Sequence, residues 1–383
     1  MVKKGYKQTE IGVIPEDWEV KPLKVVAPLQ RGFDLPYSSI KDGIYPVVFS
    51  NGIGAHHSSY MVKGPGVVMG RSGTIGKIHY VKSDYWPHNT TLWVTDFHNN
   101  DPLFASYLFK TIPWNLYNSG SGVPTLNRND VQDYLVAIPS PKEQTEIAAI
   151  LSDVDTLINS LKRQIVKKKA IKQGAMQELL TGKRRLPGFA GEWEKTVLGT
   201  VSSFYTGGTP SKKREDWWNG DIPWISSSDL TEDAITSVNI DRYISKDAVE
   251  HSATRICPKD AVLVVSRVGV GKVAVAPCEL CTSQDFTTIV PHRHNPHFLA
   301  YMLIPVMKEL AMQAQGTSIK GVTVEDIQKI IMPTPTIDEQ NQIVDILANM
   351  DSEIEALEQK LEKYSQVKQG MMQQLLTGKI RLV

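Results

Sequence analysis

Two cysteines and several histidines in the second half of the chain have the spacing of zinc ligands. Cys278 and Cys281 are separated by two residues, and His292 and His297 follow at intervals that fit a C-x2-C, H-x4-H site. The chain repeats itself, however, and the matching stretch of the first half, residues 82–99, contains no cysteine. Since the same fold is expected to form there without such ligands, the sequence favours ordinary hairpin residues and predicts no metal site.

A second short motif resembles part of an active site. Residues 295–298 read Asn-Pro-His-Phe, close to the Asn-Pro-Pro-Tyr/Phe motif with which amino-methyltransferases hold the target amine. The matching residues 101–104 read Asp-Pro-Leu-Phe, and asparagine or aspartate before proline is typical of a capped helix start. The chain also has no glycine-rich cofactor loop after a strand, no convincing nuclease carboxylate cluster and no helicase phosphate loop. These observations predict no catalytic residue and no cofactor.

Basic side chains in loops are the remaining candidates for function, because lysine and arginine contact phosphates and arginine also reads guanine. Residues 212–214 read Lys-Lys-Arg beside Trp217, and Arg71 and Arg267 occupy matching glycine-flanked turns. A solvated loop for the first group and a bracing role for the two arginines remain alternatives. The candidate nucleic-acid contacts are Arg31, Lys63, Arg71, Lys77, Arg128, Lys212, Lys213, Arg214, Arg267, Lys272 and Lys320.

The elements that must position these residues occur twice. Residues 143–186 align without a gap on residues 339–382, an offset of 339 − 143 = 196, and roughly half of the paired positions are identical. Lys-Gln-Gly and Leu-Leu-Thr-Gly-Lys stand at the same places in both copies. A chain built from two copies of one long unit usually makes two equivalent contacts with something that has two equivalent parts.

Both copies of the repeated segment predict a long helix. Capping boxes at residues 140–143 and 336–339 begin the helices, and Thr-Gly pairs at 181–182 and 377–378 end them. Each helix would contain about 40 residues and extend about 60 Å. Apolar residues recur at spacings of three and four, close to a coiled-coil seam. They are Ile147, Ile150, Leu151, Val154, Ile158, Leu161 and Ile165 in the first copy, and Leu347, Met350, Ile354, Leu357, Leu361 and Tyr364 in the second.

Neither helix would be stable alone in water with this stripe exposed, so the two are expected to pair with each other. The pairing is antiparallel if the two halves are related by a pseudo-twofold axis. Gly174 and Gly370 lie at the same place inside the helices, where drift from an ancestral copy and the close approach of another helix are both open. Basic runs at 167–169 and 183–185 are expected to face solvent.

Two globular regions alternate with the helices, at about residues 18–139 and 193–335. Both are rich in glycine, proline and short β-branched runs, which predict strands joined by turns. Residues 67–77 match residues 262–272 if one residue is dropped, and each stretch predicts a buried strand, an arginine-glycine turn and a second strand. The loops elsewhere differ between the two regions. The scaffold is therefore repeated, whereas the surface loops are not.

Composition limits the remaining possibilities. The chain has 383 residues, a formal net charge of +1 and three cysteines. This length suits two domains with their own cores, the low charge requires any nucleic-acid binding to use local patches, and three cysteines cannot form a disulfide framework. No apolar run reaches the roughly 18 residues of a membrane span, and the first residues lack the apolar stretch of a signal peptide. We expect a soluble, cytoplasmic protein.

Taken in order, these features resemble the specificity (S) subunits of type I restriction-modification systems. The resemblance covers essentially the whole chain, as variable domain, long helix, variable domain and long helix. Its local marks are the Glu-Gln helix starts at 143 and 339, Thr-Gly-Gly-Thr-Pro at 206–210, and Leu-Pro-Gly-Phe-x-Gly-x-Trp-Glu at 186–194. The first copy departs from this pattern, with Arg-Gly-Phe at 31–33 where the second has Gly-Gly-Thr at 207–209.

The resemblance implies an α+β fold with a pseudo-twofold internal repeat. Two globular target recognition domains, residues 1–139 and 187–335, would be separated by two long antiparallel helices that form a coiled coil. The conserved helical regions would span residues 140–186 and 336–383.

The resemblance further implies a subunit without chemistry of its own that binds double-stranded DNA. Each domain would read one half of a split, asymmetric target. The helices would set the length of the spacer between the halves and dock two methylation (M) subunits, which restriction (R) subunits join in the full complex. Two alternatives stay open: a self-contained DNA methyltransferase, and a coiled-coil scaffold or sugar-binding protein.

Overall fold

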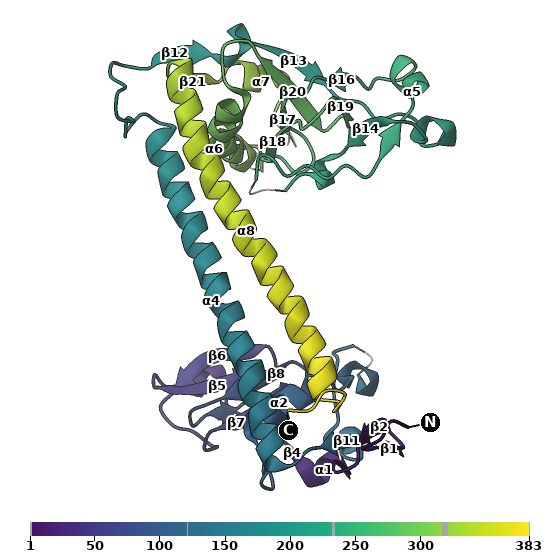
Figure 1. The fold of residues 1–383 in the computed structure, drawn as a ribbon. Coiled ribbons are helices and arrows are strands. Elements are labelled where there is room, and N and C mark those ends of the chain that lie inside the picture. Colours follow the sequence, from purple (N-terminus) through teal and green to yellow (C-terminus); the bar gives the residue numbers. More distant parts are fainter. Residues whose placement is uncertain (1, 121, 232–233, 316–320, 383) are drawn as a thin grey trace. The chain divides into compact units, whose positions relative to one another are not determined.

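The computed structural model describes residues 2–120, 122–231, 234–315 and 321–382. The chain divides into two compact units: unit 1 is residues 1–162 with 359–383, and unit 2 is residues 163–358. The two longest helices, α4 (Pro141–Leu179) and α8 (Ile337–Leu375), each pass from one unit into the other (Figure 1). The units therefore cut across the expected segments, because each contains one globular domain and half of each long helix.

Unit 1 is built mainly of short strands. Its strands are β1 (Tyr6–Thr9), β2 (Gly12–Pro15), β3 (Glu19–Pro22), β4 (Leu29–Arg31), β5 (Tyr45–Phe49), β6 (Gly52–His57), β7 (Gly66–Gly70), β8 (Ile78–Val81), β9 (Trp86–Pro87), β10 (Thr91–Val94) and β11 (Leu135–Ile138). Its shorter helices are α1 (Leu23–Val26), α2 (Pro102–Phe109), α3 (Arg128–Val131), and the 3-10 turns η1 (Tyr37–Ser39) and η2 (Trp114–Tyr117).

Unit 2 has a closely similar inventory. Its strands are β12 (Glu194–Val197), β13 (Ser202–Thr206), β14 (Ile222–Ile225), β15 (Tyr243–Ile244), β16 (Ile256–Cys257), β17 (Val262–Val265), β18 (Val273–Val275), β19 (Leu280–Thr282), β20 (Phe286–Pro291) and β21 (Ile331–Thr334). Its shorter helices are α5 (Lys246–Glu250), α6 (Pro296–Gln315), α7 (Val324–Gln328), and the 3-10 turns η3 (Leu198–Thr200), η4 (Glu215–Trp218) and η5 (Ser227–Asp229).

The two units share one sheet plan. The main sheet has the order β4-β10-β7-β8 in unit 1 and β13-β20-β17-β18 in unit 2. Each unit also has a two-stranded sheet, β11-β3 in unit 1 and β12-β21 in unit 2, and one strand of each leads into a long helix. A smaller sheet contains one parallel pair in each case, β5 with β9 and β14 with β19. The mixed α and β content and the internal repeat expected from the sequence are confirmed.

Each long helix contributes to the core of the domain that it touches. In unit 1, Ile147 and Leu151 of α4 and Leu375 of α8 pack with Trp18 and Phe104. In unit 2, the corresponding core joins Leu179 of α4 and Leu347 of α8 to α6 and the main sheet. Part of the predicted seam is therefore used against the domains. The mid-helix residues Ile158, Leu161 and Ile165 are also buried but belong to neither domain core, which is consistent with contact between the two helices.

The predicted capping boxes form only in part. Ser140 and Thr336 accept from the amides of Glu143 and Glu339, both at 3.4 Å. The glutamate side chains do not return to the helix start, because both are buried and bind a tryptophan and an arginine instead. Glu143 binds Trp18 and Arg381, and Glu339 binds Trp193 and Arg185. The predicted solvent exposure is thus wrong for Arg185, since two charge-assisted hydrogen bonds to a buried carboxylate outweigh its hydration.

The two long helices are linked by ion pairs inside each unit. In unit 2, Lys172 binds Asp351, and Lys168 lies 2.5 Å from Glu353. In unit 1, the repeat-related pair forms, with Lys368 Nζ 2.5 Å from Asp155. The lysine of the pair comes from α4 in unit 2 and from α8 in unit 1. The expectation that residues 167–169 face solvent is confirmed for Lys167 and Lys168, which are exposed, while Lys169 is half-buried. Lys168 and Lys169 also pair with glutamates of α8.

Gly174 and Gly370 do not mark a close approach. A Cβ atom added at either position would meet no atom of the described residues within 4 Å. Gly182 and Gly378, in contrast, end the helices in the left-handed conformation at φ 68°, as predicted from the Thr-Gly pairs. No described helix is both long enough and apolar enough to cross a membrane.

Candidate nucleic-acid interface

Several loops meet at one end of the main sheet of unit 1. The Arg71 amide donates to the Thr90 carbonyl at 2.9 Å, which ties the β7–β8 turn to the loop before β10. The Gly73 amide donates to the Pro124 carbonyl at 3.0 Å and adds the loop before α3. The segment after β4 forms an isolated bridge with the loop before β10. We call this group loop cluster 1: residues 31–36, 71–77, 88–90, 118–120 and 122–126.

Unit 2 has the same construction at the same end of its sheet. The Ser266 amide donates to the Asp285 carbonyl, and the Val322 amide donates to the Ser266 carbonyl, both at 2.8 Å. The Gly208 amide donates to the Thr282 carbonyl at 2.8 Å, which brings in the loop after β13. We call this group loop cluster 2: residues 207–214, 266–272, 283–285 and 321–323.

The hydrogen bonds correct the predicted match between the two turns. Arg71 and Ser266 each follow the last residue of their strand, β7 or β17. The backbone amide of each donates to the carbonyl of the residue that precedes the neighbouring strand of the main sheet, β10 or β20. Arg71 therefore matches Ser266 at an offset of 266 − 71 = 195, and no residue needs to be dropped. Arg267 matches Ser72. The two arginines lie in the same turn but at adjacent positions, so their side chains do not occupy equivalent places.

The predicted contacts of unit 1 differ in their surroundings. Arg31 lies in loop cluster 1 and pairs with Asp34 at 3.2 Å. Arg71 is half-buried, and Lys77 Nζ donates to the Asn51 carbonyl at 2.6 Å. Arg128 is exposed at the start of α3, next to the cluster. Lys63 is exposed but precedes β7, at the end of that strand away from the cluster.

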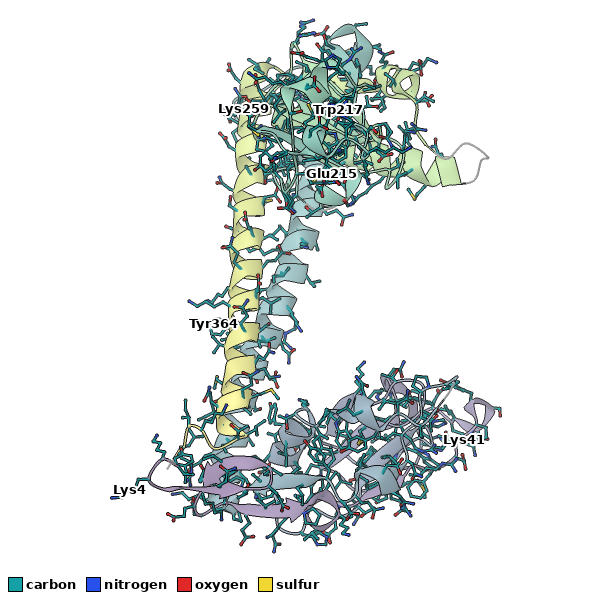
Figure 2. All side chains as sticks on the ribbon, turned by 90° about the vertical axis from the view of Figure 1, so that its right-hand side faces the viewer. Lys4, Lys41, Glu215, Trp217, Lys259 and Tyr364 are labelled. Carbon is teal, nitrogen blue, oxygen red and sulfur yellow. The ribbon has the colours of Figure 1, made fainter. Side chains whose placement is uncertain are left out.

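In unit 2, loop cluster 2 contains most of the predicted lysines and arginines. Lys212, Lys213 and Arg267 are exposed. Arg214 binds Asp216 through two hydrogen bonds of 2.9 and 2.7 Å and lies over the Trp217 ring at 4.8 Å, so its charge is already paired (Figure 2 marks Trp217). Hydrogen bonding to Asp216 raises the pKa of the Arg214 guanidinium.

Two predicted contacts remain. Lys272 Nζ donates to the carbonyls of Ser227 and Leu230 at 3.1 and 2.9 Å, which makes it a brace between β18 and the segment around η5. Lys320 lies outside the described residues. The structure therefore gathers Arg31, Arg71 and Lys77 in one cluster and Lys212, Lys213 and Arg267 in the other, while Lys272 has a structural contact.

Comparison with known proteins decides the family. The model for the type I restriction modification DNA specificity domain matches residues 15–171 and 190–365, most of the chain and one copy for each half. The chain belongs to the type I restriction-modification DNA specificity family.

One curated specificity subunit matches the chain over nearly its full length, and another matches over more than half of it. The chain is 26% identical to the putative type I restriction enzyme MjaX specificity subunit of Methanocaldococcus jannaschii, over 99% of this chain and 97% of that protein. It is 29% identical to the EcoR124I/EcoR124II specificity subunit of Escherichia coli, over 59% of this chain and 56% of that subunit. The fold is similar to that in the crystal structure of the type I restriction-modification system S subunit from M. genitalium, with a TM-score of 0.68 and 13% sequence identity. The match covers 94% of this chain and 96% of that chain.

The loop clusters also contain four polar residues that the sequence analysis did not include among the candidate contacts. The Asn89 amide donates to Asp34 in loop cluster 1, and the Thr209 hydroxyl donates to Gln284 in loop cluster 2. Asn89 is half-buried and Gln284 is exposed. The signal was present in the repeat, because the offset of 195 places a carboxamide at the same position of both copies.

An aromatic surface adjoins loop cluster 1. Tyr37 stacks on Phe49 with ring centroids 5.5 Å apart, and Phe49 lies 4.4 Å from the ring of His88. Tyr37 is 73% exposed, which leaves its outer face open for stacking. Burial lowers the pKa of His88 and favours its neutral form.

The zinc-like and methyltransferase-like motifs have structural explanations. Cys281 is buried in β19, where burial raises its pKa to about 11, and no group of three or more potential metal ligands occurs among the described residues. Asn295 caps α6 by accepting from the amides of His297 and Phe298 at 2.8 and 3.3 Å. Asp101 caps α2 in the same way, so the predicted capped helix starts are confirmed.

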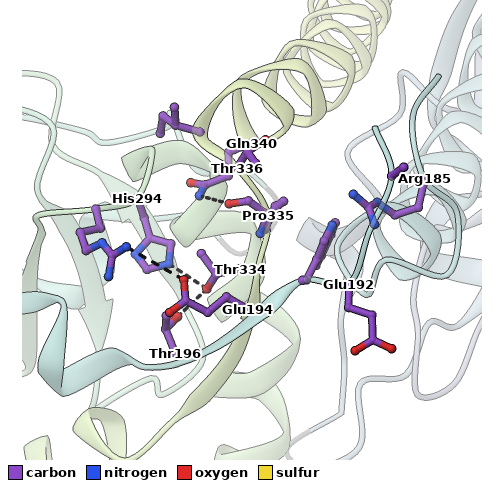
Figure 3. A pocket seen from close by; sticks show the side chains of 13 residues that line it. Arg185, Glu192, Glu194, Thr196, His294, Thr334, Pro335, Thr336 and Gln340 are labelled. Carbon is purple, nitrogen blue, oxygen red and sulfur yellow. Dashed lines mark hydrogen bonds and ion pairs between the residues drawn. The ribbon is translucent and has the colours of Figure 1, made fainter. Parts of the chain in front are cut away.

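A pocket of about 410 Å³ lies near the start of α8 (Figure 3), and none of its lining residues belongs to loop cluster 2. His294 lines it, and its Nε2 atom lies 3.1 Å from the Thr334 hydroxyl, while the buried Nδ1 atom has no hydrogen-bond partner in the described part of the chain. Burial lowers the pKa of His294, and the charge of Arg293 acts in the same direction. The matching residue of unit 1 is Asn100, whose side-chain amide donates to two carbonyls.

Proposed function

We propose that this chain is the DNA-recognition subunit of a type I methylation and restriction complex, in which each domain reads one half of a split, asymmetric target. The observation that carries this proposal is the pairing of one repeated frame with two different loop clusters. Two domains with the same sheet topology present their loops at equivalent positions, and different side chains in those loops select different bases. The proposed recognition domains are residues 1–139 and 187–335.

The long helices are proposed to form an antiparallel coiled coil that sets the spacer between the half-sites. The repeat-related ion pairs Lys172–Asp351 and Lys368–Asp155 support this role, because each fixes the register of α4 against α8 within its unit. Rigidly spaced readers select half-sites at a set separation, as dimeric DNA-binding proteins do.

Two methylation subunits are proposed as partners on the helical regions 140–186 and 336–383, joined by restriction subunits in the full complex. A groove of about 1040 Å³ in unit 2, lined by α4, α8 and α6, supports a partner site there. We assign no catalytic residue to this chain and expect it to act as a soluble cytoplasmic subunit. A self-contained methyltransferase is disfavoured because Asn295 serves as a helix cap.

The test is selection from a random duplex DNA library by the chain assembled with the methylation subunits of its own system. We expect a split motif of two different halves separated by a spacer of fixed length. Binding should fall with added salt, since phosphate contacts release counterions. Selection of one continuous motif, or methyl transfer from labelled S-adenosylmethionine by the chain alone, would contradict the proposal.

A further inference from the structure

Two carboxamide side chains occupy the same place in the two loop clusters. Asn89 precedes the residue whose carbonyl holds the β7–β8 turn, and Gln284 precedes the residue that holds the β17–β18 turn. Both therefore stand beside the turn and two residues before a central strand of the main sheet, β10 or β20. Lys77 and Lys272 also match, but both side chains already donate to backbone carbonyls.

Each carboxamide is oriented by a residue of the loop after the first sheet strand. In loop cluster 1, Asn89 Nδ2 donates to Asp34 Oδ1, and Asp34 also pairs with Arg31 at 3.2 Å. In loop cluster 2, the Thr209 hydroxyl donates to Gln284 Oε1. The orienting residue differs, an acceptor in one unit and a donor in the other. Both arrangements hold the amide in a defined direction. The contact in loop cluster 1 lies at the surface, since the Asp34 side chain is 71% exposed.

The unused hydrogen-bonding groups of the two amides are alike. An amide has two N–H donors and an oxygen with two lone pairs. Asn89 uses one N–H on Asp34 and retains its oxygen and one N–H, while Gln284 uses one lone pair on Thr209 and retains the other with both N–H groups. Each therefore keeps at least one donor and one acceptor. This is the pair that asparagine and glutamine use on adenine, whose major-groove edge presents the N7 acceptor and the N6 donor.

We propose that Asn89 and Gln284 each read an adenine in the major groove of one half-site, with Asp34 and Thr209 as the residues that position them. The proposal rests on the proposed function, since it requires that the loop clusters face DNA. It assigns the same base to both halves at one position. The difference between the half-sites then comes from the rest of each cluster, such as Arg71 against Ser266.

The experiment compares variants of the assembled complex in the random-library selection described above. Asn89→Ala should reduce the preference for one adenine in one half-site by about 5- to 150-fold, the range for one bidentate contact. The other positions and the other half should keep their preferences. Gln284→Ala should do the same in the opposite half. Asn89→Gln retains the amide and should keep adenine as the preferred base.

Asp34→Ala tests positioning, because it should weaken the preference at the same base pair as Asn89→Ala while binding to unrelated duplex DNA stays unchanged. Gln8→Ala is the matched control, as Gln8 is an exposed carboxamide of unit 1 on β1, outside the cluster. It should leave the motif unchanged.

Two outcomes separate this inference from the function on which it rests. If the unaltered complex selects no split motif, the proposed function fails. If it selects a split motif and Asn89→Ala leaves every position unchanged, weakens all sequences equally, or affects a base pair other than adenine–thymine, the function stands and the adenine assignment is wrong.

Discussion

Removing the Asp351 carboxylate should destabilise unit 2 strongly, because it binds a buried lysine. The side chain of Lys172 is 9% exposed and that of Asp351 is 17% exposed, and the Tyr301 hydroxyl donates to Asp351 at 2.6 Å. Burial raises the pKa of Tyr301, and the hydrogen bond to Asp351 raises it further, so the tyrosine stays a neutral donor. Losing one partner of a buried ion pair costs about 3–5 kcal/mol. Because the pair retains some exposure, we expect about 3 kcal/mol for Asp351→Ala.

The repeat supplies a graded comparison. In unit 1, Asp155 makes the same contacts to Lys368 and Tyr107, but the two ion-pair side chains are 30% and 19% exposed. Asp155→Ala should therefore cost less, about 1–2 kcal/mol, since water replaces part of the lost interaction. Lys168→Ala is the control on the same helix, because Lys168 and Glu353 are 46% and 57% exposed, and their pair should contribute about 0–1 kcal/mol.

Hydrogen–deuterium exchange read by mass spectrometry measures each unit separately. A loss of about 3 kcal/mol makes opening of unit 2 roughly 150 times more frequent, while peptides of unit 1 should exchange almost as before. The combined variant Lys172→Met, Asp351→Leu should recover part of the loss, because it removes both charges of this pair. An effect of Asp351→Ala no larger than that of Lys168→Ala would contradict the role of the buried ion pair. A larger loss of stability from Asp155→Ala than from Asp351→Ala would also contradict it.

Three further changes test other parts of the account. His294→Asn installs the residue that unit 1 has at this position. Because the pKa of His294 is depressed in the folded protein, stability is lost as the pH falls below about 6.5, so in urea unfolding the variant should lose less stability between pH 7 and pH 5.5. An unchanged pH dependence would contradict this. Arg267→Ala should weaken DNA binding by the complex and reduce its salt slope by about one, and unchanged affinity with an unchanged slope would assign Arg267 to structure. Seven residues inserted in both helices, near Leu161 and Leu357, should retain the heptad face and lengthen the recognised spacer by about three base pairs, and methylation at the original spacing would show that the helices do not set it.

The repeat made much of the fold predictable. The aligned copies predicted two domains and two long helices, and the Thr-Gly pairs placed the helix ends at Gly182 and Gly378. Local chemistry was also sufficient for the caps at Asp101 and Asn295, where an acceptor side chain precedes proline. These features depend on residues close in sequence.

The errors concern contacts between distant residues. Nothing in the local sequence indicates that Glu143 leaves its capping box for Arg381, which lies 238 residues away. The turn register was misjudged because glycine and arginine spacing suggested a dropped residue, whereas the strand hydrogen bonds continue without one. The Asn89–Asp34 contact joins residues 55 positions apart and becomes visible only when the sheet is formed.

The most direct test of the central claim is the exchange of one recognition domain. Residues of about 20–139 would be replaced by the same region of a relative with a different target, and the methylated motif would be mapped in cells that carry the complete complex. We predict that one half of the split motif changes to that of the relative while the other half and the spacer stay the same. A change in both halves, or in neither, would contradict the assignment of one half-site to each domain.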